Sequence, residues 1–145
     1  MDDEALLRAR LRKIEALFAG TSSSGERAAA EEALQRIRRR LEEARREEAP
    51  LEMKFTFPDQ WARRLFVALC RRYELKPYRY RRQRYTTVVL RVPRGFAQDI
   101  LWPEFQELHR ALNEYLASAT ERIIRDAVHG DAGEAPEVDD PHQLE

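Results

Sequence analysis

The amino-acid sequence predicts an α+β fold, with an N-terminal α-helical hairpin, a small three-stranded and mainly antiparallel sheet built as β-α-β-β, and a long C-terminal helix. Two patterns carry this prediction. Apolar residues recur at three- and four-residue steps near both ends of the chain, whereas strict alternation and β-branched residues lie between them. We therefore expect a helical hairpin over residues 1–48, an α+β domain over 49–129 and a disordered acidic tail over 130–145.

The first part contains two amphipathic patterns separated by a loop rich in Ser and Gly. Residues 3–19 predict the first helix, and Ser23 with Glu26 has the spacing of a capping box for the second. The second helix extends to about Arg46 and carries a heptad seam: Ala30, Leu34, Ile37, Leu41 and Ala44. Because such a hairpin buries little by itself, we expect it to pack on the rest of the chain or on a second copy.

The stretch LRKIEALFAGTSSSGERAAAEEALQRIRRRLEE resembles the N-terminal helical hairpin of a bacterial and phage domain of unknown function. The likeness covers residues 1–47 and consists of the first helix, the short Ser/Gly loop, the Glu after it and the Ala-rich second helix. The second helix departs from the pattern by carrying four arginines: Arg36, Arg38, Arg39 and Arg40. The resemblance implies a bacterial or mobile-element setting and brings no catalytic residues.

A strand and a helix follow Pro50. The strand sequence LEMKFTF alternates, which places four apolar side chains on one face: Leu51, Met53, Phe55 and Phe57. Residues 59–73 predict a helix with Pro58 at its start. One face of this helix holds Trp61, Leu65, Ala68 and Leu69, and roughly the opposite side holds Arg64 and Arg71.

The next stretch, YELKPYRYRRQRYTTVVLRVP, predicts two strands joined by a turn at RRQR. Alternation sends Tyr78 and Tyr80 to one side and Arg79 and Arg81 to the other. Residues 85–92 are rich in Tyr, Thr and Val and form the strongest strand signal in the chain. If the first two strands are neighbours, the helix between them makes them parallel.

The last helical region begins with a short helical turn over residues 94–102, which we expect to end before Pro103. A long helix then extends to about His129. Its apolar stripe is formed by Phe105, Leu108, Leu112, Leu116, Ala119 and Ile123.

A net charge of zero conceals strong charge patterning along the chain. Residues 51–100 contain 12 basic and 4 acidic side chains, whereas residues 101–145 contain 3 basic and 11 acidic ones. Such asymmetry predicts a basic surface that faces an anionic partner, or two regions of one chain or of two copies that face each other.

Several kinds of chemistry lack their residues. Cys70, in the apolar stretch LFVALC, is the single cysteine, which excludes an internal disulfide and a zinc knuckle and favours a buried structural thiol. Three scattered histidines and five glycines form no metal-ligand or phosphate-loop motif. No apolar run approaches 18 residues. We expect no enzyme activity, no cofactor, no metal, no membrane association and a cytoplasmic location.

The segment 63–94 stands out, since it holds 11 basic residues and one acid, Glu74. Clustered arginines neutralise phosphates, and tyrosines stack on unpaired bases. The segment therefore predicts binding of DNA or RNA. The expected phosphate contacts are Arg64, Arg71, Arg79, Arg81, Arg82 and Arg84, and the expected stacking residues are Tyr78, Tyr80 and Tyr85.

The same residues allow a second interpretation. Tyr78 and Tyr80 could face the core, and arginines on an edge hairpin prevent aggregation between sheets. The acids of the final helix could cover the basic face: Glu104, Glu107, Glu114 and Glu121. The alternative function is then a protein-interaction or self-assembly module that dimerises through its amphipathic helices.

Overall fold

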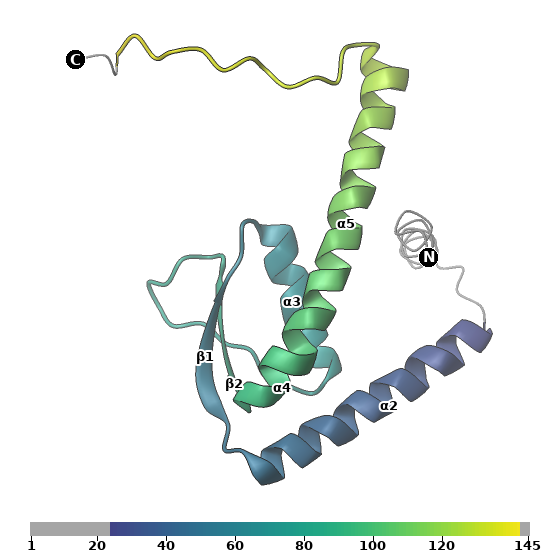
Figure 1. Ribbon diagram of the computed structural model, residues 1–145, viewed down its shortest axis with the longest axis vertical. Coiled ribbons are helices and arrows are strands. Elements are labelled where there is room, and N and C mark those ends of the chain that lie inside the picture. The colour runs from purple at the N-terminus through teal and green to yellow at the C-terminus, as the bar shows by residue number, and fades with distance from the viewer. Residues whose placement is uncertain (1–23, 143–145) are drawn as a thin grey trace. The chain divides into compact units, whose positions relative to one another are not determined.

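The computed structural model describes residues 24–142 (Figure 1). In chain order the elements are α2 (Ser24–Glu47), β1 (Leu51–Thr56), α3 (Gln60–Arg72), β2 (Thr87–Val92), α4 (Arg94–Phe96), the π-helical turn η1 (Ala97–Leu101), α5 (Trp102–Ile123) and the π-helical turn η2 (Ile124–Val128). They form two compact units, one ending at Asn113 and the other beginning at Glu114. The helix expected over residues 3–19 and Ser23 of the capping box lie outside the described residues.

Within residues 24–142 the sheet has two strands instead of the three expected. β1 and β2 are antiparallel, in a register that pairs Leu51 with Val92 and Thr56 with Thr87. The segment predicted as the middle strand contributes a single bridge, in which Tyr78 and Val89 exchange backbone hydrogen bonds of 2.9 and 2.8 Å. The condition for a parallel pair, that the first two predicted strands are neighbours, is not met within residues 24–142, because Tyr78 pairs with β2 and not with β1. Proline has no N–H to offer a ladder before Tyr78, and the chain turns after it.

Helix α3 begins at a side-chain cap and ends in a Schellman arrangement. The Asp59 carboxylate accepts the Ala62 N–H at 2.8 Å. At the other end the Leu75 N–H bonds the Cys70 carbonyl at 2.9 Å, and Glu74 occupies the left-handed position with φ 62°. The cap and the Schellman motif therefore determine where α3 begins and ends.

The buried face of α3 differs from the predicted one. The buried residues are Ala62, Phe66, Leu69 and Cys70, whereas Trp61 and Ala68 are exposed. The Phe66 ring lies 4.7 Å from that of Phe55 and 4.9 Å from that of Phe57, between ring centroids. These contacts with β1 and its end set the rotation of the helix, and they leave Trp61 outside.

The core lies between one face of the sheet and the helices α3, α4 and α5. Trp102 and Phe105 of α5 complete the aromatic cluster around Phe66. Cys70 is fully buried in it, which confirms the predicted structural thiol. Burial raises the pKa of this thiol to about 12, so that it stays protonated at neutral pH.

Helix α2 packs on this core through its predicted seam. Leu34 and Leu41 are buried, and Ile37 and Ala44 pack against the core cluster, while Ala30 at the start of the seam is exposed. Of the two partners expected for the seam, the structure therefore supplies the rest of the chain.

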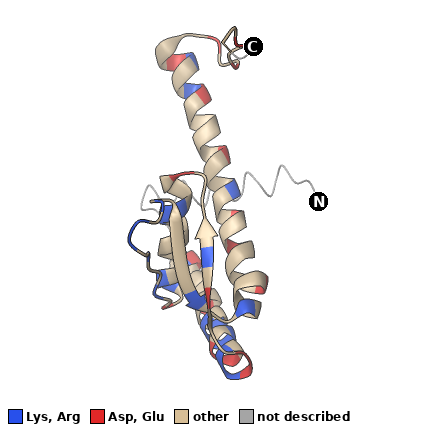
Figure 2. Ribbon diagram, turned by 90° about the vertical axis from the view of Figure 1, so that its left-hand side faces the viewer, with Lys and Arg blue, Asp and Glu red and all other residues tan. Residues whose placement is uncertain are grey.

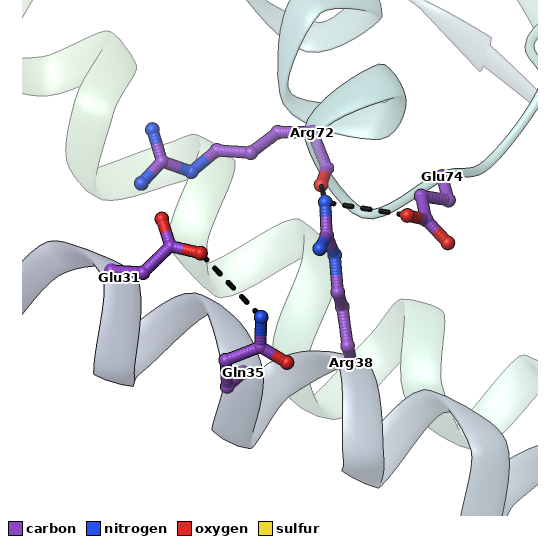
Figure 3. A network of polar contacts seen from close by, with 5 residues as sticks. All are labelled: Glu31, Gln35, Arg38, Arg72 and Glu74. Atoms are coloured by element: carbon purple, nitrogen blue, oxygen red, sulfur yellow. Dashed lines mark hydrogen bonds and ion pairs between the residues drawn. The ribbon is translucent and has the colours of Figure 1, made fainter.

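Arg38 of α2 also reaches the end of α3 (Figure 3). Its guanidinium donates to the Arg72 carbonyl at 3.1 Å and lies 3.5 Å from the Glu74 carboxylate. The contact satisfies a carbonyl that the end of the helix leaves without a partner.

The helical region after β2 does not break before Pro103, contrary to expectation. Helical structure extends from Arg94 to Val128. The Trp102 N–H bonds the Ala97 carbonyl, five residues earlier, in the π-helical turn η1. Such a widened turn accommodates the proline ring, which would collide with a carbonyl in a regular α-helix.

Candidate nucleic-acid interface

The connection between α3 and β2 is a loop held together by internal hydrogen bonds, here called the basic loop (residues 76–86). The Gln83 N–H bonds the Tyr80 carbonyl at 3.3 Å, and the Gln83 side chain accepts the Tyr80 N–H at 2.9 Å. Arg82 lies at the centre of this turn with a left-handed φ of 73°. The Arg79 side chain donates to the Gln83 carbonyl at 3.2 Å. The turn predicted at RRQR is therefore present, one residue earlier than the four letters indicate.

The arginines of the basic loop project from the protein. Figure 2 shows the loop as a mostly blue segment at the left-hand edge of the view. All four of its arginines are exposed: Arg79, Arg81, Arg82 and Arg84. These four arginines are close in sequence, and in the structure they lie on the same loop.

Tyr78 and Tyr80 hold the start of the basic loop against the outer face of the sheet, the face that carries Glu52, Val89 and Arg91. Both hydroxyls donate to the same Glu52 carboxylate oxygen, Tyr78 at 2.6 Å. Their rings meet edge to face at 5.7 Å. Val89, the bridge partner of Tyr78, is 1% exposed. Neither tyrosine belongs to the core cluster, so the expectation that they face the core is wrong.

These hydrogen bonds change the acidity of all three groups. The Tyr78 hydroxyl, and then that of Tyr80, holds the pKa of Glu52 below its ordinary value, and Arg91 acts in the same direction. The hydrogen bond to Glu52 raises the pKa of both tyrosines. The cluster therefore has a charged acceptor and two neutral donors at neutral pH.

Tyr85 holds the other end of the basic loop on α3. The Arg63 guanidinium lies 4.0 Å from the centroid of the Tyr85 ring and donates to its hydroxyl at 2.7 Å. The Arg79 guanidinium lies 5.1 Å from the same ring. Tyr85 was predicted as a stacking residue, but it is occupied by these two cations. Arg63 was not among the predicted site residues, although it belongs to the basic run.

The exposed side of α3 extends the basic surface. Arg64 and Arg71 are exposed, and the helix contains no acidic residue. Trp61, which sequence reasoning missed as a surface residue, is 53% exposed, with the Arg64 guanidinium 5.6 Å from its ring. We call the combined set the arginine surface: Arg63, Arg64, Arg71, Arg79, Arg81, Arg82 and Arg84.

The second interpretation required an acidic cover over the arginine surface. Within residues 24–113 no hydrogen bond or ion pair joins its guanidinium groups to a carboxylate. Glu104 of α5 is partly buried, and burial first and then Glu107 raise its pKa, while Arg72 at the end of α3 lowers it. The cation that acts on Glu104 is thus Arg72 and not an arginine of the basic loop.

Metal-binding groups and membrane-spanning helices are not found in the described part of the chain. Residues 24–142 contain no group of acidic, His or Cys side chains arranged to hold a metal ion. None of the described helices is long and apolar enough to span a membrane. Comparisons with protein-family models, with curated proteins and with solved structures give no match for this chain.

Proposed function

We propose that this protein binds nucleic acid, DNA or RNA, through the arginine surface. One observation carries the proposal: α3 and the basic loop, which Arg63 joins through Tyr85, together carry seven arginines, six of them exposed, and no carboxylate from residues 24–113 is bonded to them. Guanidinium groups match phosphate geometry and form paired hydrogen bonds with it. Neutralising several phosphates also releases condensed counterions, which supplies affinity without sequence recognition.

The attachment of the basic loop supports the same proposal. Glu52 holds the start of the loop, and Arg63 holds its end through Tyr85. A loop that is already ordered loses less conformational entropy when it binds. The four loop arginines therefore meet a ligand from a fixed backbone.

The test is an anisotropy titration of labelled 20-nucleotide single strands and duplexes at rising salt. The protein is compared with a variant that carries Arg79→Ala, Arg81→Ala, Arg82→Ala and Arg84→Ala. We expect this variant to bind at least about 100-fold more weakly at low salt. The slope of log affinity against log salt should fall by about 3, since each lost phosphate contact removes roughly 0.7–0.9.

The matched control removes four exposed arginines from α2: Arg36, Arg39, Arg40 and Arg45. It has the same net charge as the loop variant, so affinity within about threefold of the wild-type value is expected. Equal losses in the two variants would mean that net charge alone drives binding. The absence of any salt-dependent binding by the wild-type protein would refute the proposal.

Self-association is a second candidate, favoured by an exposed apolar pair on the last helix. Leu116 is 41% and Ile123 is 59% exposed, and seven residues separate them on one side of the helix. The seam of α2 is already buried within the chain, which leaves this stripe as the apolar helix face open to a second copy. Sedimentation of the protein and of a Leu116→Glu, Ile123→Glu variant tests it, with dimer expected in the first and monomer in the second.

A further inference from the structure

We infer that Trp61 is a base-stacking residue and that the ligand class is single-stranded nucleic acid. The inference rests on the proposed function and adds to it which form of nucleic acid is bound and which ring receives a base. It also replaces the three tyrosines that the sequence suggested for this role.

The aromatic rings beside the arginine surface differ in the contacts that they already make within the protein. Arg63 and Arg79 lie over the Tyr85 ring, at 4.0 and 5.1 Å from its centroid. Tyr78 and Tyr80 pack edge to face on each other and donate their hydroxyls to Glu52. These three rings hold the basic loop, and a base that stacked on them would have to displace those contacts.

Trp61 has no comparable structural task. Its side chain is 53% exposed, and within residues 24–142 its indole makes no hydrogen bond and packs on no other ring. The core contacts of α3 are supplied by other residues, Phe66 foremost among them. The Arg64 guanidinium lies over the Trp61 ring at 5.6 Å, farther than either cation over Tyr85, and it makes no hydrogen bond there. A large exposed aromatic ring that holds no other element in place fits a binding role.

The position of Trp61 on α3 places it beside the phosphate contacts. At 100° per residue, Trp61, Arg64 and Arg71 fall within about 80° of one another around the helix axis. The three residues therefore share the exposed side of α3. A strand whose phosphates contact Arg64 and Arg71 brings a neighbouring base next to the indole ring.

Stacking on an indole requires a base with an uncovered face. In a duplex each base is covered above and below by its neighbours, and proteins read only its edges in the grooves. Bases of a single strand expose their faces, and such stacking strengthens binding by roughly 5- to 150-fold per base. Trp61 therefore contributes to the binding of single strands and not to that of a duplex.

The experiment uses a Trp102→Phe background, in which Trp61 is the only tryptophan. Trp102 packs within the core, 5.1 Å from the Phe105 ring, so phenylalanine preserves an aromatic contact there. The protein is titrated with dT20, with rU20 and with a 20-base-pair duplex at one salt concentration. We expect either single strand, or both, to quench Trp61 fluorescence strongly, and the duplex to leave it almost unchanged.

Affinities of three further variants locate the effect in the ring. Trp61→Ala should weaken single-strand binding at least about tenfold and duplex binding less than twofold. Trp61→Leu keeps apolar bulk without a π-face and should behave like alanine, whereas Trp61→Phe should retain most of the affinity. Thermal melting of each variant, expected to match the parent, shows that the exposed substitutions leave the fold intact.

The outcomes separate the two proposals. Duplex binding as tight as single-strand binding, with Trp61→Ala equal to the parent and the loop arginines still required, would overturn this inference and leave the proposed function standing. Parallel losses of single-strand and duplex affinity in Trp61→Ala would overturn it as well. Failure of the parent to bind any of the three nucleic acids would overturn both.

Discussion

The two faces of the β1–β2 sheet contrast sharply. On the inner face Phe55, Val88 and Leu90 meet the helices in a dry core. On the outer face Glu52, Lys54 and Arg91 are exposed, and the two hydroxyls bonded to Glu52 hold the basic loop there. The apolar side chains of the inner face stabilise the fold, whereas the contacts of the outer face position the loop that carries the arginines.

This division arises from strand alternation alone. Successive residues of β1 point to opposite faces, so Met53 enters the core while its neighbours Glu52 and Lys54 do not. The exposed residues of the outer face can therefore be altered without disturbing the core. Substitutions on the inner face should change the stability of the whole unit, whereas those at Glu52 should change the loop and, under the proposed function, the affinity for nucleic acid.

The largest effect is expected from Phe66→Ala in the core. Phe66 is fully buried and contacts the rings of Phe55 and Phe57 on the sheet side. The cavity and the lost transfer free energy should lower the free energy of unfolding by about 3–5 kcal/mol. Urea denaturation followed by circular dichroism measures it.

Trp61→Ala is the matched control, since it removes an aromatic ring from the same helix on its exposed side. We expect it to cost less than about 1 kcal/mol. Similar losses in the two variants would contradict the inner-face assignment of α3.

The next effect is local and concerns Glu52→Gln on the outer face. The substitution keeps the shape of the side chain and removes the charged acceptor shared by Tyr78 and Tyr80. Amide hydrogen exchange should accelerate at Tyr78 and Val89, which bond each other, and remain unchanged at Phe66. Lys54→Gln, on the same face of β1, is the control and should leave all three amides unchanged.

The outer face should also respond to pH in two directions. The pKa of Glu52 is lowered in the folded protein, so its contribution is complete above about pH 4.5 and is lost as the pH falls through the lowered value. The pKa values of Tyr78 and Tyr80 are raised above the ordinary 10, so their contribution is complete below that pH and is lost as the pH rises through the raised values. Exchange at Val89 should therefore be slowest, after correction for intrinsic rates, between these limits.

Tyrosinate absorbance gives the direct measurement of the alkaline limit. In the wild-type protein three of the five tyrosines should ionise above the ordinary range, because burial raises the pKa of Tyr73 and the hydrogen bond to Glu52 raises those of Tyr78 and Tyr80. In Glu52→Gln only Tyr78 and Tyr80 should ionise at lower pH. Identical titrations of the two proteins would show that the hydroxyl–carboxylate contacts are absent in solution.

The inner face was largely predictable from sequence. Alternation in β1 and the heptad seam of α2 are local patterns, and each indicates a single set of buried side chains. The rotation of α3 was not. Trp61 and Phe66 are both large and apolar, and the choice between them depends on rings of β1 that meet the helix in three dimensions. The exposure of Trp61 could therefore not be predicted from sequence. The amphipathic pattern of α3 has two nearly equal apolar faces, and tertiary contacts decide which of them is buried.

The residue types of the outer face could be predicted from sequence, but the contacts between them could not. The run from Arg63 to Arg94 identified the basic surface, but the pairing of Tyr78 and Tyr80 with Glu52 joins residues 26 and 28 positions apart. The expected middle strand failed because Pro77 has no N–H to offer a ladder and the chain turns at Tyr80. Arg82 adopts a left-handed φ, which no propensity for arginine indicates.

That left-handed residue gives the smallest predicted effect. Arg82→Gly should stabilise the protein by about 0.5–1 kcal/mol, because glycine adopts a φ of 73° without the steric cost that a side chain imposes, less its greater entropy when unfolded. Urea denaturation measures the gain. Under the proposed function, affinity for nucleic acid should fall in the same variant, since Arg82 is one of the proposed phosphate contacts.

Arg81→Gly is the control that separates backbone from charge. Arg81 is the neighbouring exposed arginine of the same turn, and its φ is not positive. Glycine there relieves nothing and should destabilise the protein by about 0.5–1 kcal/mol, while it removes the same charge. The two variants should thus move stability in opposite directions and affinity in the same direction. Equal changes in stability would mean that the turn of the basic loop is not held as the structure has it, and the outer face would then present its arginines from a mobile segment.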